Sequence, residues 1–224
     1  MENRKHTSLK DLAQALGVSI PTVSRALKDS PEISRELCAK AKALAKEMNY
    51  RPNPFAMSLR KNAPRIIGVI VPDIVTHFFA SILNGIENMA IANGYFVIIT
   101  TSHESYEHEK RNIENLVNMR VEGIIACLSQ ETTDFSHISA LKDINMPLIL
   151  FDRVCLTDQF SSVIADGAQS AQMATQHLLD NGSKRVAFIG GANHLDIVKR
   201  RKHGYLEALR ENRILIEKEL VVCR

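Results

Sequence analysis

The chain has 224 residues, of which 45% are hydrophobic and 24% charged, and its formal net charge is +3. This length suits a small domain joined to a larger one. No apolar run approaches the ~18 residues of a membrane span, the charged N-terminus lacks the apolar segment of a secretory signal, and the four cysteines form no close pair. These features exclude a membrane protein and a disulfide-stapled secreted domain, and they predict a cytoplasmic protein with reduced thiols.

Positive charge is concentrated at the start of the chain. Residues 1–65 hold 13 Lys and Arg against 6 Asp and Glu (13 − 6 = +7), and the rest hold 15 against 19 (15 − 19 = −4). A basic segment of this kind is typical of proteins that bind a partner with many negative charges, such as a nucleic acid. A small lysine-rich helical domain can also be basic without such a partner, so charge alone leaves both interpretations open.

The first predicted helix spans residues 9–16. Ser8 is its N-cap, and Asp11 at the third helical position completes a pair resembling a capping box. Gly17 directly after the helix can take the left-handed conformation that ends many helices. The helix is therefore short, and the chain turns sharply after it.

Two further helices are expected before residue 50. Ser19 is the N-cap candidate of the second, with Pro21 in its first turn, where no N–H is needed. Ser34 caps a third helix over residues 35–48. Apolar side chains at helical spacing predict one small core from Leu9, Leu12, Leu16, Val23, Leu27, Leu37 and Leu44.

The tight turn at Gly17 is typical of a helix-turn-helix. Neither of the first two helices buries enough surface to be stable by itself, so the turn fixes the second helix in place. Its polar face, with Thr22, Ser24 and Arg25, is then free to enter a major groove of DNA.

A linker by composition follows at residues 51–64, with three prolines and several charges. Asn53 can cap a short helix from Pro54 to Arg60, with proline at the favoured first position. Such a helix is too short to be stable alone.

From Arg65 onward the pattern changes to alternating strands and helices, which predicts an α/β doubly wound parallel-sheet body after the small all-α head. Strands are expected at 65–73, 95–102, 122–128, 147–152, 184–191 and 220–223. Helices are expected at 77–94, 107–120, 134–146, 168–182 and 195–212. We divide the chain into a helix-turn-helix head at 1–50, a hinge at 51–64, a first body subdomain at 65–165 and the start of a second at 166–224.

Several motifs in this order resemble the LacI/GalR family of bacterial transcription regulators. In the head and hinge they are LKDLAQALGVSIPTVSRAL, EMNYRPN and AMSLR. In the body they are IIGVIVPDIVTHFF, GIENMAIANGY, VEGIIA, PLILFDR and HLLDNGSKRVAFIGG. The resemblance implies a regulator, most simply a repressor, that binds double-stranded operator DNA as a homodimer. Its body would have the periplasmic-binding-protein-like fold and would sense a small molecule, most simply a sugar or sugar derivative.

The resemblance assigns roles in the head. Ile20, Pro21 and Arg25 match recognition-helix positions that face the bases, while Thr22 and Ser24, beside the N-cap Ser19, match positions near phosphates. A guanidinium can donate hydrogen bonds to O6 and N7 of one guanine at the same time, so Arg25 is the candidate for reading a guanine. A phosphate contact by Arg25 remains the alternative. Pro21 replaces a residue that is commonly polar, so it offers only apolar contact.

The resemblance also gives the linker a role, because in the family it folds into a hinge helix on DNA. Leu59 matches the leucine that is wedged between base pairs in the minor groove and kinks the duplex. Asn53, Ala56 and Ser58 fit the same hinge pattern. Folding that is coupled to DNA binding would make the hinge a switch.

In the body, the resemblance implies an effector cleft at the carboxyl ends of the strands. The residues expected there come from four segments: Asp73, Phe78, Phe79, Asp152, Asp166 and Arg201. An aromatic ring can stack on a sugar, and a carboxylate suits paired hydroxyl groups. For Phe79 a position in the core is an equal alternative. For Arg201 the alternative is a solvated basic helix face.

Two features depart from the family pattern. His77 stands where a proline is usual before the two aromatics. From Asp166 onward 59 residues remain (224 − 165), enough for about two βα units. We therefore expect an incomplete second subdomain with exposed apolar edges, from a truncated chain or a fragment, and weakened effector binding.

An enzyme is not expected. The sequence has no G-x-G-x-x-G and no G-x-x-x-x-G-K-[ST] motif, its histidines lack metal-ligand spacing, and no Ser–His–Asp set is evident. We predict no catalytic residue, metal ligand or cofactor. The alternatives that stay open are a periplasmic-type sugar-binding protein and a DNA-binding module that acts without a ligand.

Overall fold

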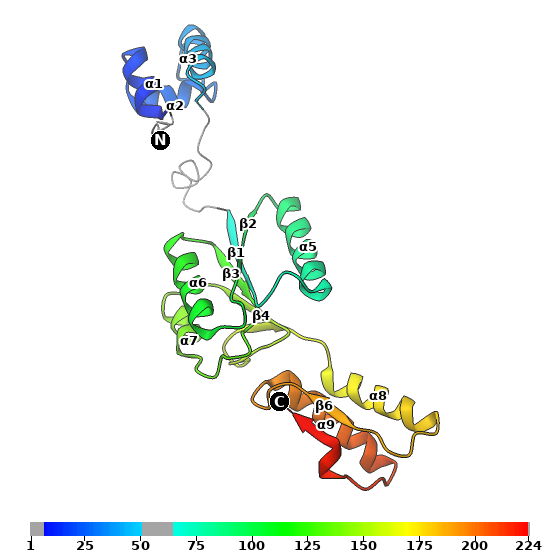
Figure 1. The fold of residues 1–224 in the computed structure, drawn as a ribbon. Helices are drawn as coiled ribbons and strands as arrows, with labels where there is room; N and C mark the ends of the chain where they lie inside the picture. Colours follow the sequence, from blue (N-terminus) through cyan, green and yellow to red (C-terminus); the bar gives the residue numbers. More distant parts are fainter. Residues whose placement is uncertain (1–6, 51–64, 224) are drawn as a thin grey trace, which may run out of the picture. The chain divides into compact units, whose positions relative to one another are not determined.

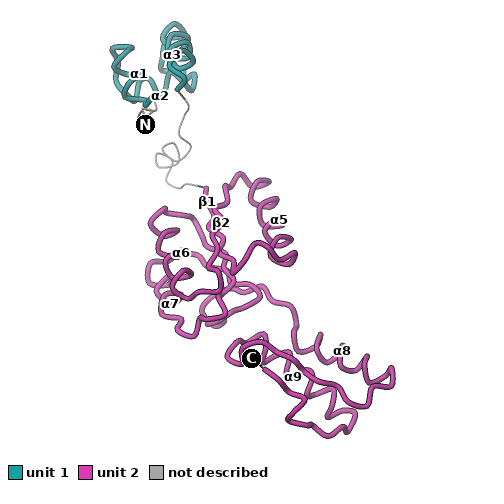
Figure 2. Tube along the Cα trace, viewed as in Figure 1, with its two compact units in different colours: residues 1–62 teal, residues 63–224 magenta. Residues whose placement is uncertain are grey.

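The computed structural model describes residues 7–50 and 65–223 (Figure 1). The chain forms two compact units, residues 1–62 and 63–224 (Figure 2). We call residues 7–50 the head and residues 65–223 the body. The predicted hinge helix, with Asn53, Ala56, Ser58 and Leu59, lies outside the described residues.

The head contains the three predicted helices, α1 (Leu9–Leu16), α2 (Ile20–Ala26) and α3 (Arg35–Glu47). Ser8 and Asp11 form the predicted capping box of α1. Gly17 ends α1 with φ 66°, a left-handed conformation that costs glycine little. Ser19 accepts a hydrogen bond from the N–H of Thr22 at the start of α2. These local caps explain why helices of seven and eight residues begin and end where they do.

The head core is built around Leu12 and Val23, both with 0% exposure. A second cluster joins α2 to α3 through Ala26, Cys38 and Ala41. Leu37 was expected in the core, but it is half-buried and belongs to neither cluster. The face of α3 that meets α2 instead carries Cys38 and Ala41, whose small side chains let the two helices pack closely.

The body contains a five-stranded parallel sheet with the strand order β2-β1-β3-β4-β5. Its strands are β1 (Ile66–Val71), β2 (Phe96–Thr101), β3 (Gly123–Ala126), β4 (Leu148–Phe151) and β5 (Ser161–Val163). Three helices connect the first four strands: α5 (His77–Ala92), α6 (Tyr106–Asn118) and α7 (Ser136–Asp143). Strand β1 lies between β2 and β3 and is buried on both faces, as its continuous apolar sequence indicates.

Two core clusters lie on opposite faces of this sheet. Val69 and Val71 pack with Phe79 and Leu83 from α5. Side chains of β1 that point the other way pack with residues of α6 and α7, in a cluster that includes Ile66, Ile70, Ile113, Leu116, Ile138 and Leu141. Helices therefore cover both faces, which confirms the predicted doubly wound fold.

The rest of the body is a smaller α/β layer. It consists of α8 (Gly167–Asp180), β6 (Phe188–Gly190), α9 (Asp196–Glu211), a 3₁₀ turn (Lys218–Leu220) and β7 (Val221–Cys223). Strands β6 and β7 pair in parallel. Figure 1 shows α8 and α9 side by side. Ile189 and Leu215 are more than four-fifths exposed, at 82% and 84%, in keeping with the expected exposure of apolar side chains here.

The four cysteines are free thiols, three of them buried (Cys38, Cys127, Cys155) and one (Cys223) half-buried. Burial raises the pKa of Cys127 to about 12. Burial and, secondarily, the charge of Glu109 raise the pKa of Cys155 to about 12. Since a thiolate is the reactive form, neither thiol is poised for chemistry.

We expect an alkylating reagent at mildly alkaline pH to modify Cys223 in the folded chain and the other three cysteines only after denaturation. Mass spectrometry of the peptides checks this pattern. Because the unfolded thiols ionise near the ordinary value of 9.0 and the folded ones near 12, stability is also expected to fall as pH rises between these two values. Rapid labelling of Cys127 or Cys155 in the folded chain would contradict the buried positions.

Candidate functional site

Helix α2 has one buried face and one exposed face. Val23 and Ala26, both with 0% exposure, anchor it to the head core. Ile20 is 40% exposed, and Pro21 and Arg25 are also exposed. The side chains predicted to face DNA bases therefore lie on the accessible face of a helix that its neighbours hold in place.

The hydroxyl groups at the start of α2 contact each other. Ser19 Oγ and Thr22 Oγ1 are 2.8 Å apart, and Ser19 Oγ also accepts the N–H of Thr22. Ser19 is exposed, while Thr22 and Ser24 are half-buried. Ser19 caps the helix and Thr22 lies in its first turn, whereas Ser24 follows in the second turn.

An ion pair that sequence reasoning missed holds Arg25. Its Nη1 lies 2.7 Å from Oε2 of Glu32, in the loop between α2 and α3. The two residues are seven positions apart across a loop, so no helical or strand period connects them.

The segment after β1 carries the first group of predicted ligand residues. Asp73 Oδ1 accepts the N–H of Val75 at 2.6 Å. Phe78 is 50% exposed, whereas Phe79 is 7% exposed and packs edge-on against Phe151 at 6.4 Å between ring centroids. Of the two aromatics, Phe78 is the one that a ligand can reach, and Phe79 occupies the core position that was its alternative.

Asp152 and Arg201 come from distant segments and interact electrostatically. Asp152 follows β4 and is half-buried. Burial raises the pKa of its carboxyl, and the positive charges of Arg153 and Arg201 oppose this shift. Arg201 is exposed on α9. A carboxylate and a guanidinium near each other at the strand ends can bind hydroxyl groups or a charged substituent of a small molecule.

Asp166 lies at the start of α8, where its side chain accepts the N–H of Gln169 at 2.9 Å. A Cβ atom built on the next residue, Gly167, would lie 3.4 Å from Cγ of Arg201. The structure thus brings the start of α8 close to Arg201. The Asp166 carboxylate is partly committed to its role as a helix cap.

A cavity of 270 Å³ lies beside these residues, and its lining includes Arg153, Lys199 and Arg200. Within the described body, its lining contains none of the six predicted ligand residues. Arg153 is held by Glu104 through two nitrogen–oxygen contacts of 2.5 and 2.9 Å. This ion pair, which the sequence did not indicate, stabilises the loop directly after Asp152.

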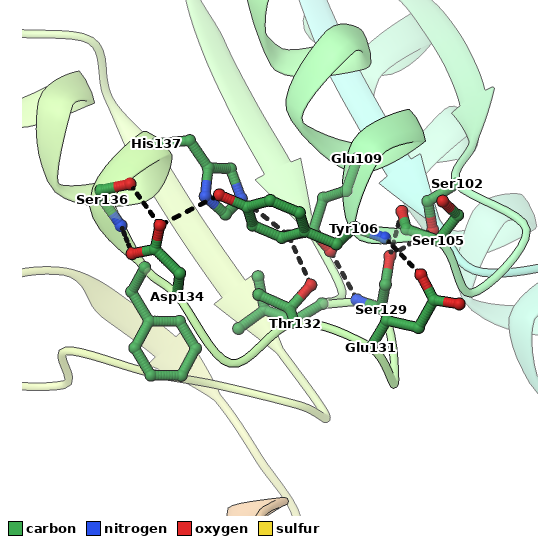
Figure 3. A network of polar contacts seen from close by, with 12 residues as sticks. Ser102, Ser105, Tyr106, Glu109, Ser129, Glu131, Thr132, Asp134, Ser136 and His137 are labelled. Atoms are coloured by element: carbon green, nitrogen blue, oxygen red, sulfur yellow. Dashed lines mark hydrogen bonds and ion pairs between the residues drawn. The ribbon is translucent and has the colours of Figure 1, made fainter.

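Figure 3 shows a buried polar network on the α6 and α7 side of the sheet. Glu109 on α6 has 0% exposure. Its Oε2 accepts the N–H of Ser129, its Oε1 accepts the hydroxyl of Thr132 at 2.9 Å, and Nε2 of His137 lies 2.8 Å from the same Oε1. One carboxylate thereby fixes the segment between β3 and α7.

The network also reaches the second layer of the body. The N–H of Gln130 donates to Glu104 at 2.7 Å, and the carbonyl oxygen of Gln130 lies 2.7 Å from Nε2 of His194. The segment that Glu109 holds is therefore bonded both to the Arg153 ion pair and to the loop before α9. These contacts connect the five-stranded sheet to the smaller layer of the body.

Two absences apply to the described parts of the chain. Within residues 7–50 and 65–223, no three His, Cys, Asp or Glu side chains are grouped as a metal site. Among the helices in these ranges, none combines the length and apolarity required to cross a membrane.

A helix-turn-helix head joined to a doubly wound α/β body is an architecture that models of known protein families match over both parts of the chain. Residues 8–53 match the model of bacterial regulatory proteins of the lacI family, and residues 65–221 match the model of periplasmic binding proteins and the sugar binding domain of the LacI family. The chain belongs to the LacI family.

Curated relatives agree with this assignment. Catabolite control protein A of Priestia megaterium is 31% identical over 222 residues, which cover 97% of this chain and 65% of the relative. The ribose operon repressor of Bacillus subtilis is 32% identical over 204 residues, which cover 91% of this chain and 60% of the relative. The chain thus spans about three fifths of the length of these relatives.

Solved structures share the fold. A lac repressor dimer bound to operator and an anti-inducer has a TM-score of 0.74 at 25% identity, covering 98% of this chain and 65% of that one. The Cra regulator of Pseudomonas putida, in complex with fructose 1-phosphate, has a TM-score of 0.64 at 26% identity, covering 71% of this chain and 57% of that one.

Proposed function

We propose that this chain is part of a cytoplasmic transcriptional regulator, most simply a repressor, that binds operator DNA through its head and senses a small molecule through its body. The observation that carries the proposal is the accessible face of α2. Ile20, Pro21 and Arg25 are exposed on it, while Val23 and Ala26 fix the opposite face in the head core. A helix held in this way can enter a major groove without itself being deformed.

The regulator is proposed to act as a homodimer. In the body, α5 and the adjoining strands form an open, almost wholly apolar groove of 630 Å³ that includes Ile82, Ile86 and Met89. Met89 and Phe96 are 67% and 64% exposed. Contiguous exposed apolar surface of this kind is typical of a protein–protein interface, and a second copy of the chain would bring a second head to a two-fold symmetric operator.

The effector is proposed to be a sugar or a sugar derivative. Phe78 offers an exposed ring for stacking on a pyranose or furanose face. Asp73, Asp152 and Asp166 supply carboxylates for hydroxyl groups, and Arg201 supplies a positive charge beside Asp152. The relatives with solved structures support this class of ligand, since one was obtained with fructose 1-phosphate.

The test is to titrate this chain against a pool of random duplexes, recover the bound ones and sequence them at several salt concentrations. We expect an enriched two-fold symmetric site, and an affinity that falls on the order of a hundredfold over about a fourfold rise in salt, because phosphate contacts release counterions. A central pyrimidine–purine step in the site would agree with the wedge role that the sequence predicts for Leu59. Arg25→Ala is the matched variant and should lose the preference at one base pair.

The other outcomes separate the alternatives. Enrichment of a single half-site would mean that one head reads DNA without dimerisation of this chain. An absence of enrichment at every salt concentration would contradict the proposed regulator and leave the body as a binding module.

A further inference from the structure

The structure suggests what decides between the two roles open to Arg25, reading a base or clamping a phosphate. Nη1 of Arg25 lies 2.7 Å from Oε2 of Glu32, and the two side chains are 60% and 65% exposed. The pair stands on the accessible side of the head, at the end of α2. An exposed ion pair adds little to the stability of the fold. Its main effect is on the orientation of the Arg25 guanidinium.

Glu32 is placed by a loop that folds back on α2. The N–H groups of Lys28 and Ser30 both donate to the carbonyl oxygen of Arg25, each at 3.1 Å. Ile33 packs against the cluster of Ala26, Cys38 and Ala41, and its N–H donates to Ser30 at 3.0 Å. The backbone on both sides of Glu32 is therefore held to the helix that carries Arg25.

The other acidic residue of this loop has its own partner. Asp29 contacts Nζ of Lys42 on α3 at 2.5 and 2.7 Å. Asp29 therefore does not compete for the guanidinium, and each carboxylate of the loop is matched to one cation. A carboxylate near DNA raises the free energy of any arrangement that brings phosphates close to it, because the charges repel.

We propose that Glu32 is a positioning residue that holds Arg25 for reading a guanine and disfavours its use as a phosphate clamp. A guanidinium has five N–H donors in a fixed fork. Glu32 engages the Nη1 group, which leaves other N–H groups of the same plane for O6 and N7 of guanine. Glu32 thus gives specificity at the expense of affinity for arbitrary DNA. This inference rests on the proposed DNA-binding function and deepens it.

The experiment compares Glu32→Gln with Glu36→Gln in the full chain. Glu36 is a matched control because it is an exposed glutamate of the same head, paired with Lys40 within α3 at 2.8 Å. Both variants add one unit of positive charge, so both should tighten binding to random duplexes. Only Glu32→Gln should also weaken the preference at one base pair, by about threefold to tenfold, which is about 0.7–1.4 kcal/mol. This is part of the discrimination that a bidentate arginine–guanine contact provides, because the guanidinium is still present but no longer held.

Arg25→Gln identifies that base pair, because the protein should lose its preference for guanine at this position when the guanidinium is absent. In the double variant of Arg25 and Glu32, the second substitution should cause no further loss of preference. Circular dichroism confirms that each variant keeps its helices.

The outcomes distinguish the two proposals. If the unmodified chain shows no base preference, the DNA-binding function is wrong and the role of Glu32 falls with it. If the chain selects a site but Glu32→Gln keeps the same preferences as Glu36→Gln, the function stands and the positioning role of Glu32 is overturned.

Discussion

Replacing Glu109 by glutamine is expected to lower the free energy of unfolding of the body by about 3 kcal/mol, as typical of breaking a buried charged hydrogen-bond network. The carboxylate accepts the N–H of Ser129 and the hydroxyl of Thr132, and it lies within hydrogen-bond distance of His137. A glutamine of the same shape has one acceptor oxygen in place of two. If its NH₂ group takes the place of Oε2, it faces the N–H of Ser129, and if it takes the place of Oε1, Thr132 and His137 must change from donor to acceptor to meet it. With 0% exposure at this position, water cannot replace the lost contact.

Glu114→Gln is the matched control, since Glu114 lies on the same helix and is exposed. Urea unfolding followed by circular dichroism gives the free-energy difference, and hydrogen exchange of residues 128–137 shows whether that segment loosens first. Equal stability of the two variants would mean that the network contributes nothing measurable.

The helix boundaries and the main strand of this fold depend on local sequence patterns, and these patterns could be predicted from the sequence. Ser8, Ser19 and Gly17 punctuate α1 and α2 because caps act over three or four residues. The apolar run of β1 indicated a strand covered on both faces, because successive side chains of a strand point to opposite faces and here both kinds are apolar. Strand β5 escaped the prediction, since three exposed residues carry neither an apolar run nor alternation.

The polar pairs that organise the sites were not readable in this way. Glu104 and Arg153 are 49 residues apart, and Glu109 and His137 are 28 apart. They meet only because the parallel sheet brings successive strand ends to one edge. The core of the head shows the same limit on a smaller scale: Leu37 has the apolar character of a core residue, but the rotation of α3 turns Cys38 and Ala41 inward instead.

Helices α8 and α9 pack closely at Gly204, in the middle of α9, so a larger side chain at this position is expected to destabilise the protein. A Cβ atom added there would lie 1.9 Å from the carbonyl oxygen of Ala168 and 3.0 Å from the backbone nitrogen of Gln172, both on α8. These are backbone atoms, so no side-chain rotation can relieve the overlap, and the helices must separate. Alanine is favoured over glycine in a helix by only about 1 kcal/mol, which cannot offset this displacement.

Gly204→Ala is therefore expected to destabilise the α8–α9 layer by about 3 kcal/mol or more, at the upper end of what overpacking costs. Gly167→Ala is the matched control in the same helix pair, because its Cβ would meet only side-chain atoms at ordinary contact distance, Cγ of Arg201 at 3.4 Å and Cβ of Arg200 at 3.8 Å. Hydrogen exchange should show faster exchange in α8 and α9 for Gly204→Ala, with the five-stranded sheet still protected. If both alanine variants exchange like the unmodified chain, the close approach of α8 and α9 is not a feature of the protein in solution. A selective loosening would instead identify this contact as what holds the smaller layer together, and with it the position of Arg201 beside Asp152.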